Sequence, residues 1–175
     1  IKNFPKQFSY EPAVENGVLP ISFSAFAVVA MGGSALAAEV LLAGKPETNL
    51  VIHQDYGLPS SGEAELARRL FILISYSGNT EEVISAFHDA IERKSALVVI
   101  AAGGELLDLA RQNSIPFIRI PNTGIQPRMA VGFLLKALFK VIGDNDNLNK
   151  LSELEQVFKA SNCETKSESP AQALR

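Results

Sequence analysis

Three aliphatic hydroxyl side chains lie within the six residues SYSGNT at positions 75–80: Ser75, Ser77 and Thr80. The apolar run LFILI ends just before them, and a segment with helical spacing follows. Hydroxyl groups and free backbone N–H groups at the positive end of a helix can hold a phosphate without a lysine. A helix cap is the simpler alternative, since Thr80 precedes two acidic residues, but it leaves Ser75, Ser77 and Asn79 unexplained. The pattern therefore favours a site for a small phosphorylated metabolite.

A second turn that could do chemistry contains Gly32, Gly33 and Ser34, in the stretch AMGGSALAAEVL. Paired glycines let a backbone turn sharply and approach a ligand closely, and Ser34 can cap the helix that follows. The glycine spacing of the dinucleotide fingerprint is absent, and so is the lysine of the phosphate-binding loop. A plain tight turn and a ligand-approach loop therefore explain this stretch equally well.

A third turn, in PNTGIQPRMAVGFLLKAL, is made rigid by Pro121 and Pro127 and leads to Arg128. The spacing predicts a helix over 128–141, with Arg128 in its first turn. A cation at the start of a helix is unfavourable with the helix dipole, so its position needs another reason. Either Arg128 extends to solvent or pairs with an acidic residue, or its guanidinium fixes an anion or a developing oxyanion.

Five apolar runs rich in Val, Ile and Phe would position these turns, and each is bounded by Gly, Pro, Asn or Ser. They are SFSAFAVVA (22–30), TNLVIH (48–53), LFILIS (70–75), ALVVIA (96–101) and IPFIRI (115–120). Segments with helical spacing lie between them, which predicts an α/β fold with a five-stranded, doubly wound parallel sheet and helices on both faces. In such a sheet ligands bind beyond the carboxyl ends of the strands, where the three turns would meet.

The last part of the chain has a different pattern. DNDN is typical of a turn, and LNKLSELEQVFKA (148–160) predicts a surface helix. The polar stretch that follows is typical of a linker, so the expected domain covers residues 1–160. The chain does not begin with methionine and ends at Arg175 inside a helical pattern, so we expect it to be a piece of a longer protein.

Composition excludes several classes of function. The chain of 175 residues carries a net charge of −3, so no basic field is present to hold nucleic acid by its phosphates. Its longest apolar stretch is broken by serines and is too short to span a membrane. Cys163 is the one cysteine, which rules out a disulfide within the chain and makes a reducing, cytoplasmic compartment the expected location. No cluster of His or Cys residues has metal-ligand spacing, so no metal is expected.

Together the three turns resemble a known family. MGGSA after the first strand, SYSGNTEE after the third and GIQPRMAVGFLL after the fifth are similar to the sugar isomerase (SIS) domain. The likeness extends to the N-terminal SIS domain of the bifunctional phosphoglucose/phosphomannose isomerases, and DYGLP at 55–59 also resembles that group. It covers roughly residues 27–141 and implies a flavodoxin-like three-layer sandwich.

The resemblance implies roles for individual residues. The expected substrate-binding residues lie in the first two turns: Ser34, Ser75, Ser77 and Thr80 for the sugar phosphate, and Gly32, Gly33, Gly78 and Asn79 for the shape of the loop. In the third turn, Arg128 would steady the enediolate that forms as a proton moves between C1 and C2 of a hexose 6-phosphate. No cofactor is implied.

Enzymes of this family are homodimers with two SIS domains in tandem, and their catalytic glutamate and histidine belong to the second domain. The resemblance therefore implies that residues 161–175 are a linker and the start of a helix leading to a domain outside this chain. Neither Glu81 nor His88 is expected to be the catalytic base. The apolar helix at 129–142 is expected to help form the dimer interface.

Two other functions remain open. A stand-alone, single-domain sugar-phosphate isomerase would suit the length, but that group resembles G-x-G-R-S after the first strand, where this chain has GGSAL. A non-enzymatic, sugar-phosphate-binding regulatory module is the other, but no DNA-binding segment or basic patch is present in the sequence. The expected function is the sugar-phosphate-binding half of an isomerase that interconverts glucose 6-phosphate and mannose 6-phosphate with fructose 6-phosphate.

Overall fold

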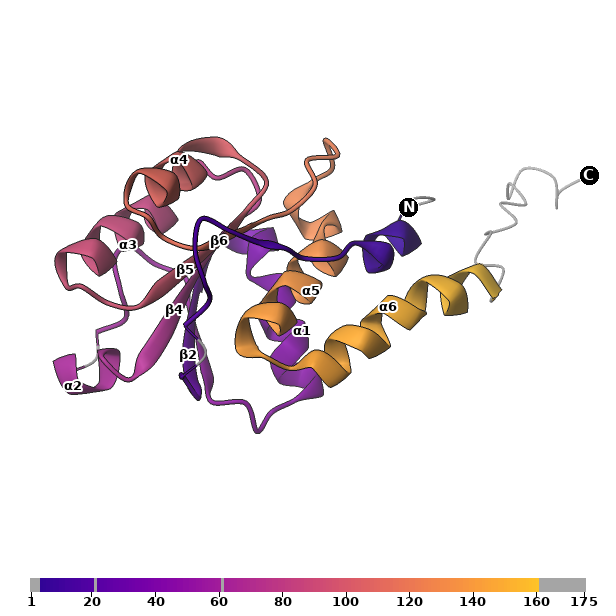
Figure 1. Ribbon diagram of the computed structural model, residues 1–175, viewed down its shortest axis with the longest axis horizontal. Coiled ribbons are helices and arrows are strands. Elements are labelled where there is room, and N and C mark those ends of the chain that lie inside the picture. The colour runs from indigo at the N-terminus through magenta and orange to yellow at the C-terminus, as the bar shows by residue number, and fades with distance from the viewer. Residues whose placement is uncertain (1–3, 21, 61, 161–175) are drawn as a thin grey trace, which may run out of the picture.

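The computed structural model describes residues 4–20, 22–60 and 62–160. Its centre is a six-stranded sheet in the order β1-β6-β5-β4-β2-β3 (Figure 1). The strands are β1 (Val14–Glu15), β2 (Ala25–Ala30), β3 (Leu50–His53), β4 (Arg69–Ser75), β5 (Leu97–Ala101) and β6 (Phe117–Arg119). The five strands β2 to β6 are parallel and correspond to the five predicted apolar runs, which confirms the predicted fold class.

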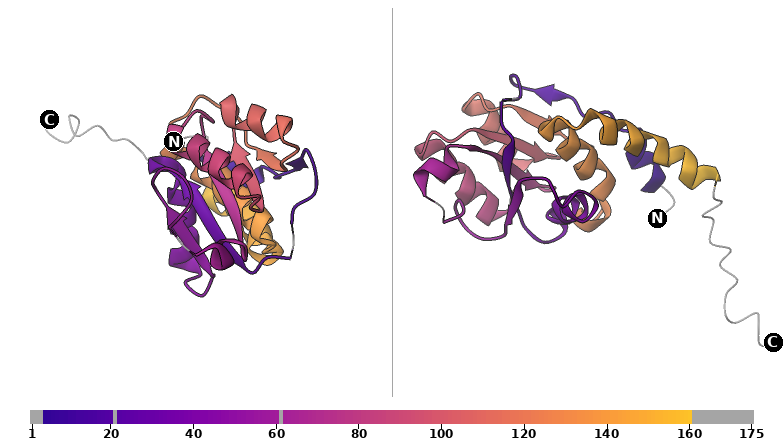
Figure 2. Two further views of the ribbon diagram at one scale, coloured as in Figure 1. Left: turned by 90° about the vertical axis from the view of Figure 1, so that its left-hand side faces the viewer. Right: turned by 90° about the horizontal axis from the view of Figure 1, so that it is seen from below.

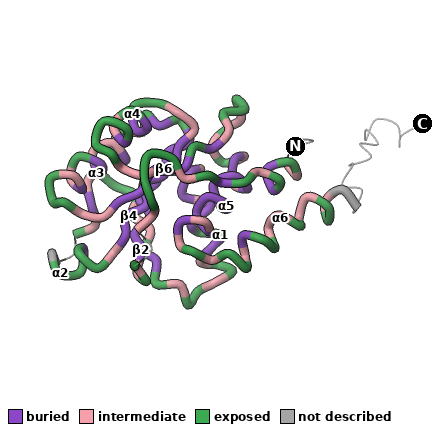
Figure 3. Tube along the Cα trace, in the orientation of Figure 1, coloured by how far each residue is buried: buried purple, intermediate pink, exposed green. Residues whose placement is uncertain are grey.

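Helices cover both faces of the sheet and complete the predicted three layers (Figures 1 and 2). α1 (Leu36–Gly44) and α5 (Val131–Ile142) pack on one face, and α3 (Glu81–Glu92) and α4 (Gly104–Gln112) pack on the other. Because alternate residues of a strand point to opposite faces, the strands β2, β4, β5 and β6 each contribute to two separate cores. The central strands β2, β4 and β5 are buried along almost their whole length, because both of their faces are covered (Figure 3).

The order of the strands places the first two turns together. β2 lies between β3 and β4, so the connections leaving β2 and β4 run to opposite edges of the sheet. A doubly wound sheet opens a crevice beyond the carboxyl ends of the two strands at such a switch point. The 3-10 helix η2 (Gly32–Ser34) follows β2, and the loop 75–80 follows β4. The fold therefore brings both turns to this crevice.

Two elements differ from the sequence prediction. The helix predicted over 128–141 begins only at Val131, because Arg128 belongs to a separate 3-10 helix, η3 (Pro127–Met129). The sheet also gains the antiparallel edge strand β1, whose two residues are too few to show an apolar pattern.

The DNDN stretch is a helix start and not a turn. α6 (Asn145–Ala160) begins inside it, and Asp144 Oδ1 accepts a hydrogen bond from Asn147 N (3.1 Å). Residues 161–175, the predicted linker, lie outside the described residues. Within the part of the chain that the structure describes, no helix combines the length and apolar character that a membrane span needs.

α5 is an interior helix. Every residue from Gly132 to Phe139 is buried. α1, α6 and the 3-10 helix η1 (Phe4–Ser9) surround it, and η1 lies beside α6 at the outer edge of the molecule (Figures 1 and 2). The prediction that this helix helps form a dimer interface is therefore wrong, because its apolar side chains are covered within the chain.

Candidate functional site

The loop 75–80 is held in shape by its own hydroxyl groups. Ser75, at the end of β4, is 1% exposed, and its Oγ lies 2.8 Å from Thr80 Oγ1 and accepts a hydrogen bond from Gly78 N (3.0 Å). Ser77 Oγ accepts a hydrogen bond from Asn79 N (3.2 Å) and lies 3.5 Å from Ser75 Oγ. The three hydroxyl groups singled out in the sequence therefore form one cluster.

Thr80 occupies the N-cap position of α3, but its side chain does not cap the helix. The hydroxyl bonds to Ser75 instead, so the simple cap that the sequence allowed is not formed. The first N–H groups of α3 carry the positive end of the helix dipole and receive no bond from the cap side chain. An anion bound here would meet these N–H groups and the hydroxyl cluster together.

A glycine pair after β5 lets the loop close, and the sequence reasoning did not single it out. Gly78 has φ +75°, and a Cβ atom there would overlap the carbonyl oxygen of Gly103. Gly104 also has φ +75°, a conformation that favours glycine. Asn79 Oδ1 accepts a hydrogen bond from Glu105 N (2.9 Å), so Asn79 caps the start of α4. The available signal was the pair GG directly after an apolar run.

Ser34 joins the turn after β2 to the loop after β4. Ser34 is 5% exposed, and its Oγ accepts a hydrogen bond from Tyr76 N (3.2 Å). The N-cap of α1 is Ala35, so the prediction that Ser34 caps this helix is wrong. Gly32 lies in the same turn with φ +49° and is exposed. Ser34 therefore supports the loop that carries the hydroxyl cluster through its hydrogen bond with Tyr76 N.

Gly33 lets the turn after β2 pack closely against the turn that carries Arg128. A Cβ atom at Gly33 would lie 2.5 Å from Arg128 N and 2.9 Å from Arg128 Cα. Real Cβ contacts are not this short, so only glycine lets the two backbones come so close. Gly33, the second glycine of the pair, thus serves a close approach to the turn that carries Arg128, whereas Gly32 has nothing within 4 Å of its Cβ position.

Arg128 is exposed and lies in η3, ahead of α5. The argument from the helix dipole does not apply to it, because α5 starts at Val131. Arg69 and Arg111 pair with carboxylates, whereas Arg128 makes no hydrogen bond or ion pair with any residue in the described ranges. Pairing with an acidic residue is thereby excluded there, and the guanidinium is free to meet solvent or a ligand.

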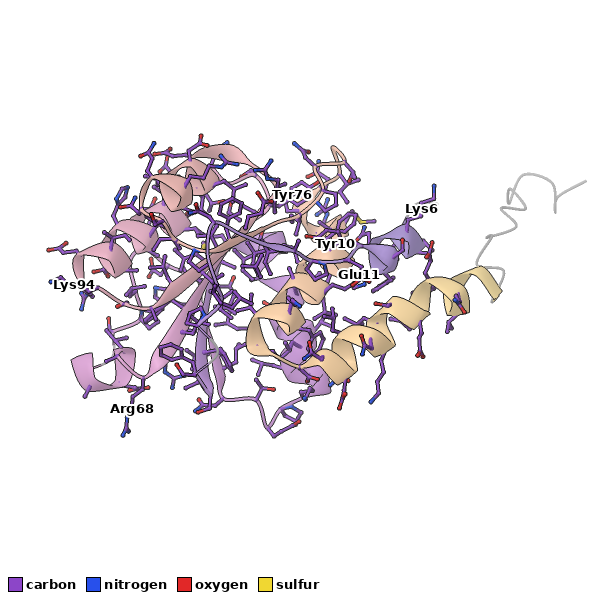
Figure 4. The ribbon with its side chains drawn as sticks, in the orientation of Figure 1. Lys6, Tyr10, Glu11, Arg68, Tyr76 and Lys94 are labelled. Atoms are coloured by element: carbon purple, nitrogen blue, oxygen red, sulfur yellow. The ribbon has the colours of Figure 1, made fainter. Side chains whose placement is uncertain are left out.

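Tyr76 links the loop 75–80 to the segment that leads to η3. Its side chain is 7% exposed, and its hydroxyl oxygen accepts a hydrogen bond from Thr123 N (3.2 Å). Figure 4 shows Tyr76 near the segment between β6 and α5. Through Ser34, Gly33 and Tyr76 the three turns become one continuous surface at the carboxyl edge of the sheet.

The histidines and acids around this surface offer no metal site. His53, at the end of β3, lies 3.4 Å from the carbonyl oxygen of Tyr56. Glu81 Oε2 accepts a hydrogen bond from Tyr56 Oη (3.4 Å), and His88 is exposed on α3. The described residues contain no group of three or more His, Cys, Asp or Glu side chains that could hold a metal ion. What the site offers is hydrogen-bond donors for an anion.

The sequence relatives include several enzymes of one name, although none of the protein-family models matches the chain. The chain is 35% identical over 109 residues to the bifunctional phosphoglucose/phosphomannose isomerase of Caldicellulosiruptor bescii, which covers 61% of this chain and 31% of the relative. It is 32% identical over 136 residues to the enzyme of the same name from Thermoplasma acidophilum, which covers 77% of this chain and 39% of the relative. The chain therefore spans well under half the length of the curated relatives it matches.

Solved structures share the arrangement of strands and helices. A candidate phosphosugar isomerase from Silicibacter pomeroyi has a TM-score of 0.57 and 19% identity, and the match covers 79% of this chain and 45% of that one. The sugar isomerase domain of the RpiR transcription factor from Sphaerobacter thermophilus has a TM-score of 0.51 and 15% identity, and the match covers 79% of each chain. At such identities these likenesses show the fold alone. Together with the sequence relatives, this fold supports a SIS domain in this chain.

Proposed function

We propose that this chain is the sugar-phosphate-binding half of an aldose-ketose isomerase that interconverts glucose 6-phosphate and mannose 6-phosphate with fructose 6-phosphate. The observation that carries the proposal is the hydroxyl cluster of 75–80 at the start of α3, located at the switch point of the sheet. The names of the sequence relatives supply the substrate class. The net charge is −3, so a phosphate must be held by local groups and not by a general basic field.

The hydroxyl groups of the loop would have two different roles, one in shaping the loop and one in binding the phosphate. Ser75 is buried and already bonded to Thr80 and to Gly78 N, so its hydroxyl orients the loop. A hydroxyl group offers one O–H donor and two acceptor lone pairs. The more accessible hydroxyls of Ser77 and Thr80 would donate to the phosphate oxygens, together with the first N–H groups of α3. Ser34 would hold the loop in place through its bond to Tyr76 N.

Arg128 would act on the other end of the sugar. Isomerisation moves a proton between C1 and C2 through an enediolate, so negative charge develops on an oxygen of the substrate. A guanidinium without a carboxylate partner in the described residues is suited to stabilise that charge. Gly33 places the Arg128 backbone beside the turn after β2, and Ser34 joins that turn to the loop 75–80, so a hexose phosphate bound at 75–80 would extend toward Arg128.

Proton transfer also requires a general base, and we assign none to the described residues. The chain spans 31% and 39% of two related isomerases, so we propose that the base belongs to the rest of a longer protein. The chain alone would then bind a sugar phosphate without converting it. A homodimer in the cytoplasm, acting in carbohydrate metabolism, is part of the same proposal.

The experiment is an interconversion assay on the intact protein. Fructose 6-phosphate is added, and the formation of glucose 6-phosphate and mannose 6-phosphate is followed. We expect both products, and Arg128→Ala should lower kcat by about 100-fold or more, as the loss of an oxyanion donor does elsewhere. Arg119→Ala is the matched control, because Arg119 is exposed like Arg128 but lies at the end of β6 and pairs with Glu15.

Two outcomes would contradict parts of the proposal. Saturable binding of fructose 6-phosphate by the intact protein, without any interconversion, would favour the regulatory module. Isomerisation by residues 1–175 alone would show that the base lies within this chain.

A further inference from the structure

The N-terminal 3-10 helix η1 reaches the turn of Arg128 through one side chain. Gln7 is 4% exposed, and its Nε2 donates a hydrogen bond to the carbonyl oxygen of Met129 (2.6 Å). Its Oε1 accepts a hydrogen bond from Gly132 N (2.9 Å). One carboxamide therefore bonds to η3 at one end and to the first turn of α5 at the other.

This double contact fixes the junction between η3 and α5. No side chain of an N-cap residue caps α5, so Gln7 supplies an acceptor that the helix start otherwise lacks. A Cβ atom at Gly132 would lie 2.8 Å from Gln7 Cβ and 2.9 Å from Gln7 Oε1, so the glycine makes room for the carboxamide. A buried carboxamide with both ends bonded is a rigid contact, because either end left unpaired would cost free energy.

Arg128 directly precedes Met129, so its backbone is held from two sides. Gly33 packs against Arg128 N and Cα, and Gln7 holds the next carbonyl group. We propose that Gln7 is a positioning residue for Arg128, so that the N-terminal segment sets the place of the guanidinium at the site. This inference rests on the proposed function of Arg128.

Gln7 is not needed merely to keep the N-terminal segment attached. Lys136 on α5 is fully buried, and its Nζ donates hydrogen bonds to Phe8 O (2.8 Å), Glu11 Oε1 (2.8 Å) and Ser152 Oγ (2.7 Å). The rings of Phe4, Phe8 and Phe158 also pack on one another at centroid distances of 5.5 to 6.0 Å. The segment thus has its own anchors, which leaves the contact of Gln7 with the Arg128 turn as a separate feature.

The test compares Gln7→Met with Lys136→Met in the intact protein. Both substitutions keep an unbranched side chain of similar length and remove buried hydrogen bonds, but only the first touches the Arg128 turn. We expect Gln7→Met to lower kcat about tenfold while KM stays within about twofold, because small displacements of a catalytic group are costly. Lys136→Met should lower the melting temperature but leave kcat within about twofold where it is folded.

A double-mutant cycle separates positioning from general damage. If Gln7 acts through Arg128, Gln7→Met should lower kcat less than about twofold in an Arg128→Lys background. The same tenfold loss in both backgrounds would overturn the inference. So would an unchanged kcat in Gln7→Met, or an equal loss of kcat in Lys136→Met.

Gln7→Glu adds a readout that depends on pH. A protonated carboxyl group can donate to Met129 O and accept from Gly132 N as the amide does, whereas a carboxylate can only accept. The kcat of Gln7→Glu relative to wild type should therefore rise as the pH falls, and a ratio that does not change with pH would count against the inference. A wild-type protein without any isomerase activity would overturn the proposed function, and this inference with it.

Discussion

The loop 75–80 and the turn of Arg128 lie at the same edge of the sheet, but they are held in opposite ways. The loop keeps its shape through bonds among its own residues, chiefly Ser75 with Thr80 and with Gly78 N. The turn of Arg128 has two backbone hydrogen bonds of its own but no cluster of side-chain hydroxyl groups, and Gly33 and Gln7 fix it from outside. These two supports lie 95 and 121 positions earlier in the chain.

This difference bears on how the site would work. The hydroxyl groups of the loop are oriented mainly by one another, although Ser34 and the glycine pair after β5 also support the loop. The turn of Arg128 is held by two distant segments, so its position depends on how those segments pack. A substitution in either segment could therefore displace the guanidinium of Arg128. Binding of the phosphate and stabilisation of the enediolate should therefore respond differently to substitutions.

The largest effect is expected where the loop is tightest. Gly78→Ala combines φ +75° with an overlap between the new Cβ atom and Gly103 O, and should lower the free energy of unfolding by about 3 kcal/mol or more. Gly124→Ala is the matched control, since Gly124 has φ +69° but open space around it, and it should cost only about 1 kcal/mol. Urea denaturation of both variants measures the difference. Equal losses would mean that the loop is not as tightly closed as described.

The turn of Arg128 should give a smaller loss of stability and a clear loss of rate. Gly33→Ala forces the Arg128 backbone away and should cost about 1 to 3 kcal/mol of stability, as overpacking usually does. The kcat of the intact protein should fall while the affinity for fructose 6-phosphate changes little. Gly44→Ala, at a site with nothing within 4 Å, is the control. If Gly33→Ala lowered the affinity for fructose 6-phosphate as much as kcat, the loop 75–80 and the turn of Arg128 would not have the separate roles described.

Ser77→Ala should show the reverse pattern. Its hydroxyl is exposed in the loop, so removing it should weaken sugar-phosphate binding by about 1 to 3 kcal/mol with little change in stability. Isothermal titration calorimetry with fructose 6-phosphate gives the affinity, and Ser9→Ala, whose exposed hydroxyl bonds only to Lys6 O, serves as the control. An unchanged affinity would remove Ser77 from the phosphate site.

The smallest effect should be a loss of stability at high pH, caused by Tyr10 in the N-terminal segment that also carries Gln7. Burial, with the nearby carboxylates of Glu15 and Glu11, raises the pKa of Tyr10 to about 12 from 10.0. The folded state therefore favours the neutral phenol, so its contribution to stability is complete below pH 10 and is lost as the pH rises toward 12. Figure 4 shows Tyr10 and Glu11 in the segment beside α5. Melting curves of wild type and Tyr10→Phe should diverge over this window, and parallel curves would contradict the assignment.

The same comparison explains what the sequence could and could not predict. The loop 75–80 is local, so its hydroxyl groups, its glycine and its place after a buried strand were all visible in one stretch. Arg128 was also found, but its supports were not, because the contact of Gln7 with the start of α5 depends on tertiary packing. The start of α5 was misplaced for a related reason, since Pro127 and Arg128 form a 3-10 turn of their own.

Capping was the other weak point of the sequence reasoning. A serine or threonine before a helix predicts a cap, yet Ser34 and Thr80 both direct their hydroxyl groups to the loop. Local propensity gave way here to hydrogen bonds between segments that the parallel sheet brings together. The cap of α4 comes instead from Asn79, across a connection of 26 positions.

Calorimetric titration of the intact protein with fructose 6-phosphate and with fructose tests the central claim most directly. If the hydroxyl cluster and the start of α3 form the phosphate site, fructose 6-phosphate should bind saturably and fructose should bind at least about 100-fold more weakly, which corresponds to about 2.7 kcal/mol. Equal affinity for the two sugars, or no binding of either, would contradict the claim.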